Sequence, residues 1–153
     1  MQNTIHPITL KLPQMKTIKR CSMLHLIFQM VATLAVSPLL YLAEFHISGT
    51  VAAASQAMPI TLMGTLFVAF AAGSFSIYSR IAPNGGKSII AYYLTSKCLS
   101  MLLALGSIAV YGIVATDGHV ALFALNVMAL YVVFLVNSSL LYASVERKLK
   151  KMQ

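Results

Sequence analysis

The stretch SIIAYYLTSKCLSMLLALGSIAVYGIVA, residues 88–115, decides the fold of this chain. It contains 28 residues and a single charged side chain, Lys97. A helix needs about 20 apolar residues to cross about 30 Å of hydrocarbon, so the stretch predicts a transmembrane helix. An ionisable residue inside such a run is costly, which makes Lys97 a candidate functional residue.

Polar and small side chains recur on one side of this expected helix. They follow steps of four and three residues: Tyr93, Lys97, Ser100, Ala104, Ser107 and Tyr111. Such steps place side chains on one stripe of a helix. The opposite side is aliphatic, with Leu94, Leu99, Leu102, Leu103 and Val110. The pattern therefore predicts one face toward other helices and one face toward lipid.

The composition of the whole chain is typical of an integral membrane protein. Of its 153 residues, 59% are hydrophobic and 9% are charged, whereas a soluble domain has about 25% charged residues. A net charge of +8 would suit nucleic acid, but the basic residues lie at the chain ends and in one loop. That distribution is a topology signal, so we expect membrane lipid and no nucleic acid as a partner.

Apolar runs predict four spans, at about 22–43, 58–79, 88–115 and 120–143. A basic arm, residues 1–21 with Pro7 and Pro13, precedes them, and a basic tail, 144–153, follows. The connecting loops are expected at 44–57, at 80–87 with the turn sequence PNGG, and at 116–119. A cleaved signal peptide is the competing interpretation of the first run, whose apolar stretch is too long for that class.

The distribution of Lys and Arg predicts the topology. The arm has four, the loop at 80–87 has two, the tail has four, and the other two loops have none. All ten fall on one side of the expected membrane, so the positive-inside rule places both termini in the cytoplasm. Short loops make consecutive helices antiparallel neighbours. We therefore predict an all-α, antiparallel bundle of four transmembrane helices.

The other spans also carry polar or small residues at helical spacing. His25, Gln29, Thr33 and Ser37 recur every four residues in the first span, where Pro38 is an expected kink. Ala69 and Gly73 form a small-xxx-small pair in the second span, a pattern that allows close helix approach. The residues that we expect to bind a partner or another helix are Lys97, Tyr93, Ser100, Ser107, Gln29, Asn126 and Asn137.

The titratable residues form no catalytic pattern. The three acids are Glu44, Asp117 and Glu146, and we expect the first two in loops outside the membrane. Without paired carboxylates or a Ser-His-Asp or Cys-His spacing, we expect neither an enzyme nor a cofactor. A metal site of His46 and His119 with those two loop acids is the alternative, but solvated loop side chains explain the same residues more simply.

The two cysteines, Cys21 and Cys98, lie in dissimilar places and are interpreted as ordinary thiols. Their spacing suits neither a metal pair nor a disulfide relay, because the chain has no C-x-x-C. We therefore expect no metal centre.

Lys97 has two interpretations. It lies ten residues after Lys87, about 15 Å of helix, and snorkelling toward the headgroups would satisfy its ammonium. The alternative is that Lys97 faces a neighbouring helix and meets an anionic or carbonyl partner. Within the chain, Glu146 is the acid expected on the correct side of the membrane; otherwise the partner belongs to another protein.

Two segments resemble the ATP synthase subunit I family, small bacterial membrane proteins of four helices. These segments are SKCLSMLLALGSIAVYGIV (96–114) and ALFALNVMALYVVFLVNSSLL (121–141). The third helix of that family carries a lysine followed by an apolar run, and KCLSML (97–102) matches this form. The similarity covers about residues 90–145. Many members have a glutamate three residues before the lysine, where this chain has Leu94.

The resemblance implies an accessory or assembly factor of the F-type ATP synthase in the bacterial inner membrane, assisting assembly of the rotor ring of c subunits. Rotor subunits of this kind carry a mid-membrane carboxylate, which would pair with Lys97. Divalent-cation transport, chiefly of magnesium, is also implied, but Leu94 stands where a coordinating acid would be. A small transporter or channel subunit, an uncharacterised structural membrane protein and a homo-oligomer remain alternatives.

Overall fold

The computed structural model describes residues 7–82, 87–115 and 119–150. The regular elements in these ranges are three helices: α1 (Pro7–Ile81), α2 (Lys87–Val114) and α3 (Val120–Lys150). They contain four segments that are long and apolar enough to cross a membrane: Met15–Ile47, Gly49–Ile81, Ser88–Val114 and Val120–Lys148. The predictions of an all-α chain and of four such segments are confirmed.

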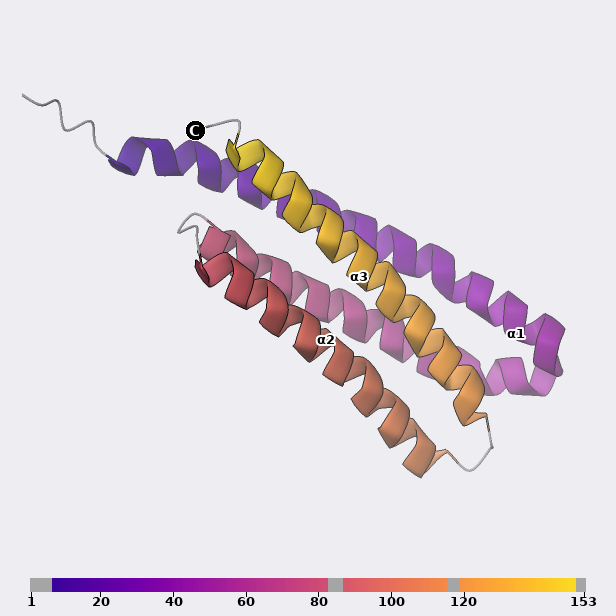
Figure 1. The fold of residues 1–153 in the computed structure, drawn as a ribbon. Coiled ribbons are helices and arrows are strands. Elements are labelled where there is room, and N and C mark those ends of the chain that lie inside the picture. Colours follow the sequence, from indigo (N-terminus) through magenta and orange to yellow (C-terminus); the bar gives the residue numbers. More distant parts are fainter. Residues whose placement is uncertain (1–6, 83–86, 116–118, 151–153) are drawn as a thin grey trace, which may run out of the picture.

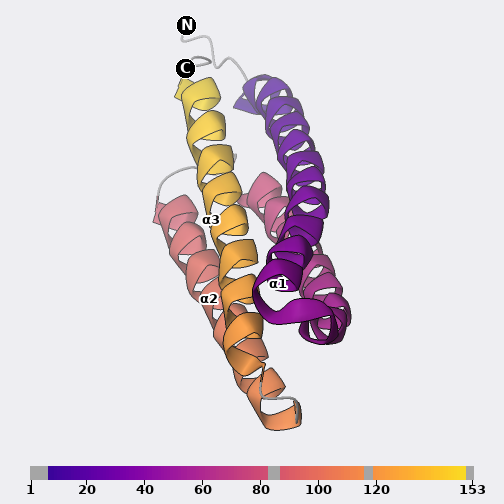
Figure 2. The same cartoon turned by 90° about the vertical axis from the view of Figure 1, so that its right-hand side faces the viewer.

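Helix α1 reverses its direction at Gly49. This residue has φ 84° and ψ 178°, a region of backbone space that is essentially restricted to glycine because a Cβ atom would clash. Gly49 divides α1 into a first limb (7–48) and a second limb (50–81), which Figures 1 and 2 show folded against each other. The expected loop at 44–57 is therefore wrong. These residues are helical apart from Gly49, since alanine-rich sequence favours helix.

The helices also extend beyond the predicted spans at both chain ends. Helix α1 begins at Pro7, because the fixed φ of proline suits the first helical position, and it continues through Pro13 and Pro38. Helix α3 runs to Lys150, so most of the expected tail is helical. Val145 is buried there, and packing against the core explains why the helix persists past the apolar run.

The helical segments run alternately in opposite directions, and α3 lies along both limbs of α1 and along α2 (Figures 1 and 2). Contacts of α3 with α1 and with α2 are more extensive than those between α1 and α2. The start of α1 and the end of α3 lie at the same end of the bundle (Figure 2). Helix α3 therefore packs against both α1 and α2 and is positioned to contact side chains of each.

Aromatic rings fill much of the core, and aliphatic side chains cover much of the outside. The rings of Phe67 and Phe134 have centroids 6.0 Å apart, and those of Tyr78 and Tyr142 lie 4.5 Å apart. By contrast, Ile113 is 85% exposed on the outer side of α2. An apolar exterior over a packed aromatic centre is the arrangement that a lipid environment requires.

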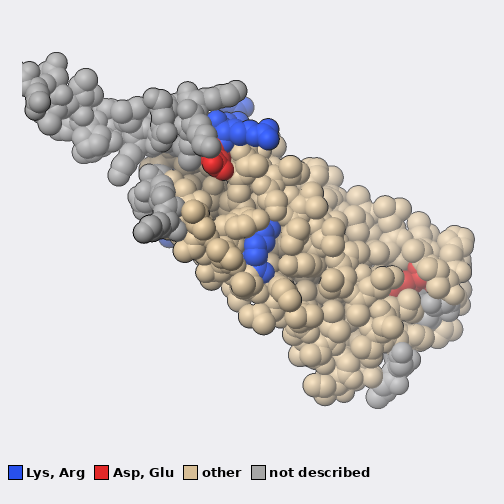
Figure 3. All heavy atoms as spheres, viewed as in Figure 1, with Lys and Arg blue, Asp and Glu red and all other residues tan. Residues whose placement is uncertain are grey.

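Basic side chains gather toward the end of the bundle where α1 begins and α3 ends (Figure 3). The described and exposed ones are Lys16, Lys19, Arg20, Arg80, Arg147 and Lys148. Uncharged surface covers most of the remainder of this face, interrupted by one basic and one acidic patch (Figure 3).

Candidate functional site: two polar layers inside the bundle

The predicted polar stripe of α2 turns toward the other helices. Ser100 and Ala104 are buried, whereas Leu99 and Val110 are exposed. Leu103, expected on the lipid side, is instead partly buried against the core. The sequence periodicity therefore identified the orientation of α2 except at two positions, Leu103 and Tyr93; Tyr93 was expected on the inner face and is 36% exposed.

Lys97 is half-buried and directs its ammonium at α3. Its Nζ donates a hydrogen bond of 3.2 Å to the carbonyl oxygen of Leu135 and another to the hydroxyl of Ser138. The same Nζ lies 5.4 Å from the ring centroid of Tyr93 and 5.6 Å from that of Phe134. A cation over two aromatic faces gains electrostatic stabilisation. Lys97 thus meets a neighbouring helix through a carbonyl and a hydroxyl rather than turning toward an end of the bundle.

Asn137 connects α3 to the first limb of α1. Its Nδ2 donates to the side-chain oxygen of Gln29 at 2.9 Å and to the carbonyl oxygen of His25 at 3.0 Å. The Nδ1 atom of His25 lies 2.9 Å from Oδ1 of Asn137 and acts as the donor in this pair. Gln29 and Asn137 are fully buried. We call the residues Lys97, Ser138, Asn137, His25 and Gln29 the Lys97 layer.

A second polar cluster, the Glu44 layer, lies nearer to Gly49 and consists of Glu44, Asn126, Gln56 and Tyr111. Asn126 Nδ2 donates to Oε1 of Glu44, and Gln56 Nε2 donates to the hydroxyl of Tyr111 at 2.7 Å. Glu44 is only 4% exposed. Its expected place in a loop outside the spans is therefore wrong, because the first limb continues as helix and packs this carboxylate against α3.

Two oxygen atoms of the Glu44 layer, Oε2 of Glu44 and Oε1 of Gln56, are buried and have no hydrogen-bond partner among the residues that the structure describes. A buried acceptor of this kind is costly unless a donor or a cation reaches it. Glu44 lies five positions before Gly49 and Gln56 lies seven positions after it. Their distances from the turn, measured along each limb, are therefore similar, at about 7.5 and about 10.5 Å. The Glu44 layer therefore has two buried oxygen atoms that can still accept a hydrogen bond or bind a cation.

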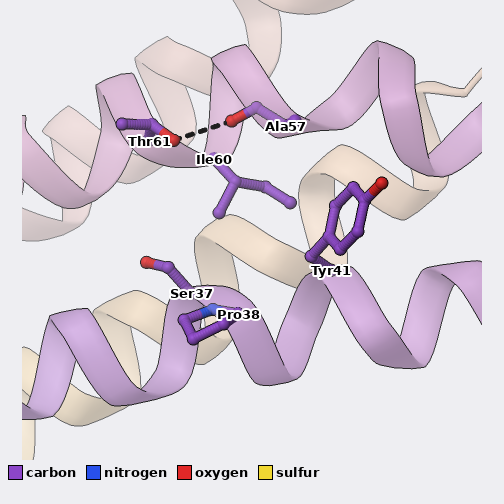
Figure 4. A pocket seen from close by; sticks show the side chains of 6 residues that line it. All are labelled: Ser37, Pro38, Tyr41, Ala57, Ile60 and Thr61. Atoms are coloured by element: carbon purple, nitrogen blue, oxygen red, sulfur yellow. Dashed lines mark hydrogen bonds between the residues drawn. The ribbon is translucent and has the colours of Figure 1, made fainter.

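A hollow of about 290 Å³ lies between the two limbs of α1, next to the Glu44 layer. Its lining residues are Ser37, Pro38, Tyr41, Ala57, Ile60 and Thr61. Figure 4 shows that Ile60 and Tyr41 project into the space between the limbs. Thr61 uses its hydroxyl within its own limb, donating to the carbonyl of Ala57 at 2.8 Å (Figure 4). The lining is mostly apolar, so this hollow offers little specific chemistry.

The remaining predicted site residues lie along α2 and contact their own helix or an aromatic ring. Ser100 donates to the carbonyl of Lys97 at 2.9 Å, and Ser107 donates to that of Leu103 at 2.7 Å. Tyr93 packs edge-on against Tyr142. The two serines therefore contribute small volume to the inner face of α2, and their hydroxyls are used locally.

The alternative metal site is not assembled in the described residues. His46 is exposed and His119 is half-buried, and Asp117 lies outside the described residues. No group of three or more His, Cys, Asp and Glu side chains able to hold a metal ion occurs in the described ranges. Cys21 is buried and Cys98 is exposed, both as free thiols.

The close approach of the two limbs occurs at Gly64 and not at the predicted pair Ala69 and Gly73. A Cβ atom on Gly64 would lie 2.9 Å from Cγ2 of Thr33, whereas one on Gly73 would meet no atom within 4 Å. Ala69 is exposed. The small-xxx-small pair therefore did not predict this contact, because both of its members are exposed.

Sequence reasoning missed Glu44, Gln56 and Ser138 as site residues. The first two lie where a loop was expected, and their spacing across a single turning glycine carries no recognisable motif. Ser138 follows the predicted Asn137, and its role depends on the rotation of α3 relative to α2.

Comparison with known proteins adds no family to this picture. No family model, no curated protein and no solved structure matches the chain.

Proposed function

We propose that this chain is a non-enzymatic, multi-pass protein of the bacterial inner membrane that acts as an accessory or assembly factor of the F-type ATP synthase. In this role it assists the c subunits in forming the rotor ring. Two considerations support the proposal: the resemblance carried by residues 96–114 and 121–141, and the placement of Lys97 on a helix whose outer face is apolar.

The charge distribution supports an orientation with both chain ends in the cytoplasm. The exposed basic side chains gather at the end where α1 begins and α3 ends (Figure 3). Positively charged segments are retained on the cytoplasmic side during membrane insertion. That orientation gives Lys97 a place within the membrane, about two to three turns from the cytoplasmic end of α2.

The single observation that carries the assembly role is the half-buried ammonium of Lys97. A lysine ammonium has three N–H donors, and Leu135 and Ser138 accept two of them. The described residues supply no third acceptor, so one donor is available to a partner. A cation at this depth gains most from an anionic partner, and the mid-membrane carboxylate implied for rotor subunits has the required charge.

Affinity capture from mild detergent tests this role directly. Tagged wild-type protein should recover rotor c subunits, and Lys97→Met should reduce that recovery at least about tenfold, since a charge-assisted contact within a membrane is lost. Lys16→Met is the matched control, because it removes an exposed lysine at the end of the bundle and should leave recovery unchanged. Equal recovery by the wild type and Lys97→Met would exclude this role for Lys97.

A second variant separates partner binding from internal stability. Ser138→Ala removes one internal acceptor of Lys97 but keeps its charge, so it should retain the c subunits. Loss of recovery in Ser138→Ala and Lys97→Met alike would assign Lys97 to folding. A double-mutant cycle between Lys97 and the acid of the partner then measures their coupling, which vanishes if the two never meet.

A small cation transporter is the second candidate function, and the Glu44 layer is the observation that favours it. The buried oxygens of Glu44 and Gln56 that lack hydrogen bonds are of the type that Mg²⁺, Ca²⁺ and other hard cations prefer. Uptake of Mg²⁺ or Na⁺ into proteoliposomes should then fall to the background in Glu44→Gln and persist in Glu146→Gln. Background uptake by the wild type would exclude transport of these ions.

A further inference from the structure

A cavity of about 400 Å³ lies between the start of α1 and the end of α3. It is separate from both polar layers except for His25, whose side chain contributes to its wall. The other lining residues are Thr17, Arg20, Cys21, Leu24, Ser144 and Lys148. Small-molecule sites in proteins occupy about 300–1,000 Å³, so the cavity has room for a compact ligand.

The lining is cationic and rich in donors. Arg20 comes from α1 and Lys148 from α3, so two helices each supply a permanent positive charge. Thr17 and Ser144 add hydroxyl groups. The acid of this region, Glu146, lies two positions from Ser144 and from Lys148. Residues two apart do not share a helix face, and Glu146 is not among the residues that line the cavity. The cavity therefore favours an anion.

The shape of the charged groups suits a tetrahedral oxyanion. Arginine presents a planar fork of N–H donors, and lysine presents a compact ammonium, and both bind phosphate well. The hydrogen bond that the structure gives to Lys148 Nζ is to the sulfur of Cys21 at 3.1 Å. Sulfur is a weak acceptor, so a phosphate oxygen would be a much stronger partner for this ammonium.

The position of the cavity is that of a lipid headgroup. The apolar segments run from Met15 to Ile47 and from Val120 to Lys148, so the cavity residues of α1 and α3 occupy the outermost turns of two spans. Leu24, 65% exposed on its wall, extends the cavity toward the apolar side. Basic pockets between transmembrane helices at the membrane surface bind anionic headgroups.

We propose that this cavity is a binding site for a phosphate group, with Arg20 and Lys148 as the charged ligands and Thr17 and Ser144 as neutral donors. An anionic phospholipid is the source that the apolar wall at Leu24 favours. The site can be tested separately from the assembly role, because its four proposed ligands belong to neither polar layer; His25 is the lining residue that the cavity shares with the Lys97 layer.

Native mass spectrometry of the full chain, released from nanodiscs of phosphatidylcholine doped with phosphatidylglycerol, tests the site. The wild type should retain phosphatidylglycerol in preference to phosphatidylcholine. The double variant Arg20→Gln with Lys148→Gln should weaken this retention about tenfold or more, because each basic residue contributes to anionic-lipid affinity. The matched control, Lys16→Gln with Arg147→Gln, removes two charges from the same ends of the same helices and should retain the lipid.

Each other result has a defined meaning. Equal loss in both double variants would overturn the site and indicate a diffuse surface potential. Equal retention of the two lipids by the wild type would overturn it as well. Displacement of phosphatidylglycerol by inorganic phosphate at a similar affinity would keep the site and identify its ligand as free phosphate. A thermal unfolding midpoint measured in detergent for each variant shows that lost retention does not reflect unfolding.

Discussion

The two polar layers differ in how completely their hydrogen bonds are made. In the Lys97 layer, Asn137 uses its side chain in three hydrogen bonds to the first limb of α1, and Lys97 has two acceptors on α3. In the Glu44 layer, Glu44 and Gln56 each have one buried oxygen that receives no hydrogen bond from the described part of the chain. One layer therefore fixes helix packing, and the other retains capacity for a cation, a proton or water.

The two layers also carry opposite charges that do not neutralise each other. Asn126 and Asn137, which mark the layers on α3, are eleven residues apart, about 16 Å along a helix. An ion pair requires a separation of about 4 Å. Lys97 and Glu44 therefore do not form an ion pair with each other, and each is a better candidate for a ligand contact than for a structural salt bridge.

Gly49→Ala is expected to lower the free energy of unfolding more than the other substitutions that we propose. It alters the turn that places Glu44 and Gln56 at similar distances from Gly49 on the two limbs of α1. A Cβ atom at φ 84° and ψ 178° strains the backbone, and we expect a loss of about 2–3 kcal/mol in the free energy of unfolding. Steric trapping in bicelles measures this free energy of unfolding for the wild type and for Gly49→Ala. A change below about 0.5 kcal/mol would show that the chain turns elsewhere.

Gly64→Ala should open the contact between the two limbs of α1. The new Cβ would lie 2.9 Å from Cγ2 of Thr33, a buried, β-branched side chain that has little rotamer freedom. We expect Gly64→Ala to lower the free energy of unfolding by about 2 kcal/mol. Gly73→Ala is the control, since a Cβ there meets no atom within 4 Å, and it should be neutral or slightly stabilising. Equal effects of the two would contradict this packing.

Asn137→Ala should break the Lys97 layer at its centre. The substitution removes three hydrogen bonds and leaves the side-chain oxygen of Gln29 buried without its donor, which we expect to cost about 1.5 kcal/mol. Ser139→Ala is the neighbouring control, because its hydroxyl donates within α3, to the carbonyl of Leu135. Denaturation in detergent mixtures, monitored by circular dichroism, compares them. If Asn137→Ala lowers the free energy of unfolding no more than Ser139→Ala does, the hydrogen bonds of Asn137 do not stabilise the Lys97 layer.

Much of the architecture could be predicted from the sequence because hydropathy and charge act over whole segments. The run 88–115 predicted α2, and its 3-4 spacing predicted which side of α2 faces the bundle. The acceptors of Lys97 could not be predicted in the same way. One is the carbonyl of Leu135, a group that every residue has, and its position depends on how α3 is rotated and shifted against α2.

The two members of the Glu44 layer on α1, Glu44 and Gln56, escaped prediction because a single residue makes the turn between them, whereas Asn126 and Tyr111 were predicted on polar stripes. The sequence around Gly49 is weakly polar and has no proline or paired glycine turn, so it does not distinguish a long loop from a sharp reversal. Gly64 was more accessible to prediction. It shares the stripe of Phe67, Ala71 and Phe75 at helical steps, and these residues are buried, whereas Gly73 lies off that stripe.

Glu44→Gln is expected to have the smallest effect and gives the sharpest comparison with Asn137→Ala. Glutamine keeps the oxygen that accepts from Asn126 and replaces the oxygen that has no donor with an amide that can itself donate. The free energy of unfolding should therefore change by no more than about 0.5 kcal/mol in either direction, measured by steric trapping in buffer without added divalent cation. A loss of about 2 kcal/mol would mean that the negative charge of Glu44 already stabilises the fold, through a bound cation or an ordered donor. In that case the two layers would be equally satisfied in the membrane, and the case for transport would depend on identifying that cation.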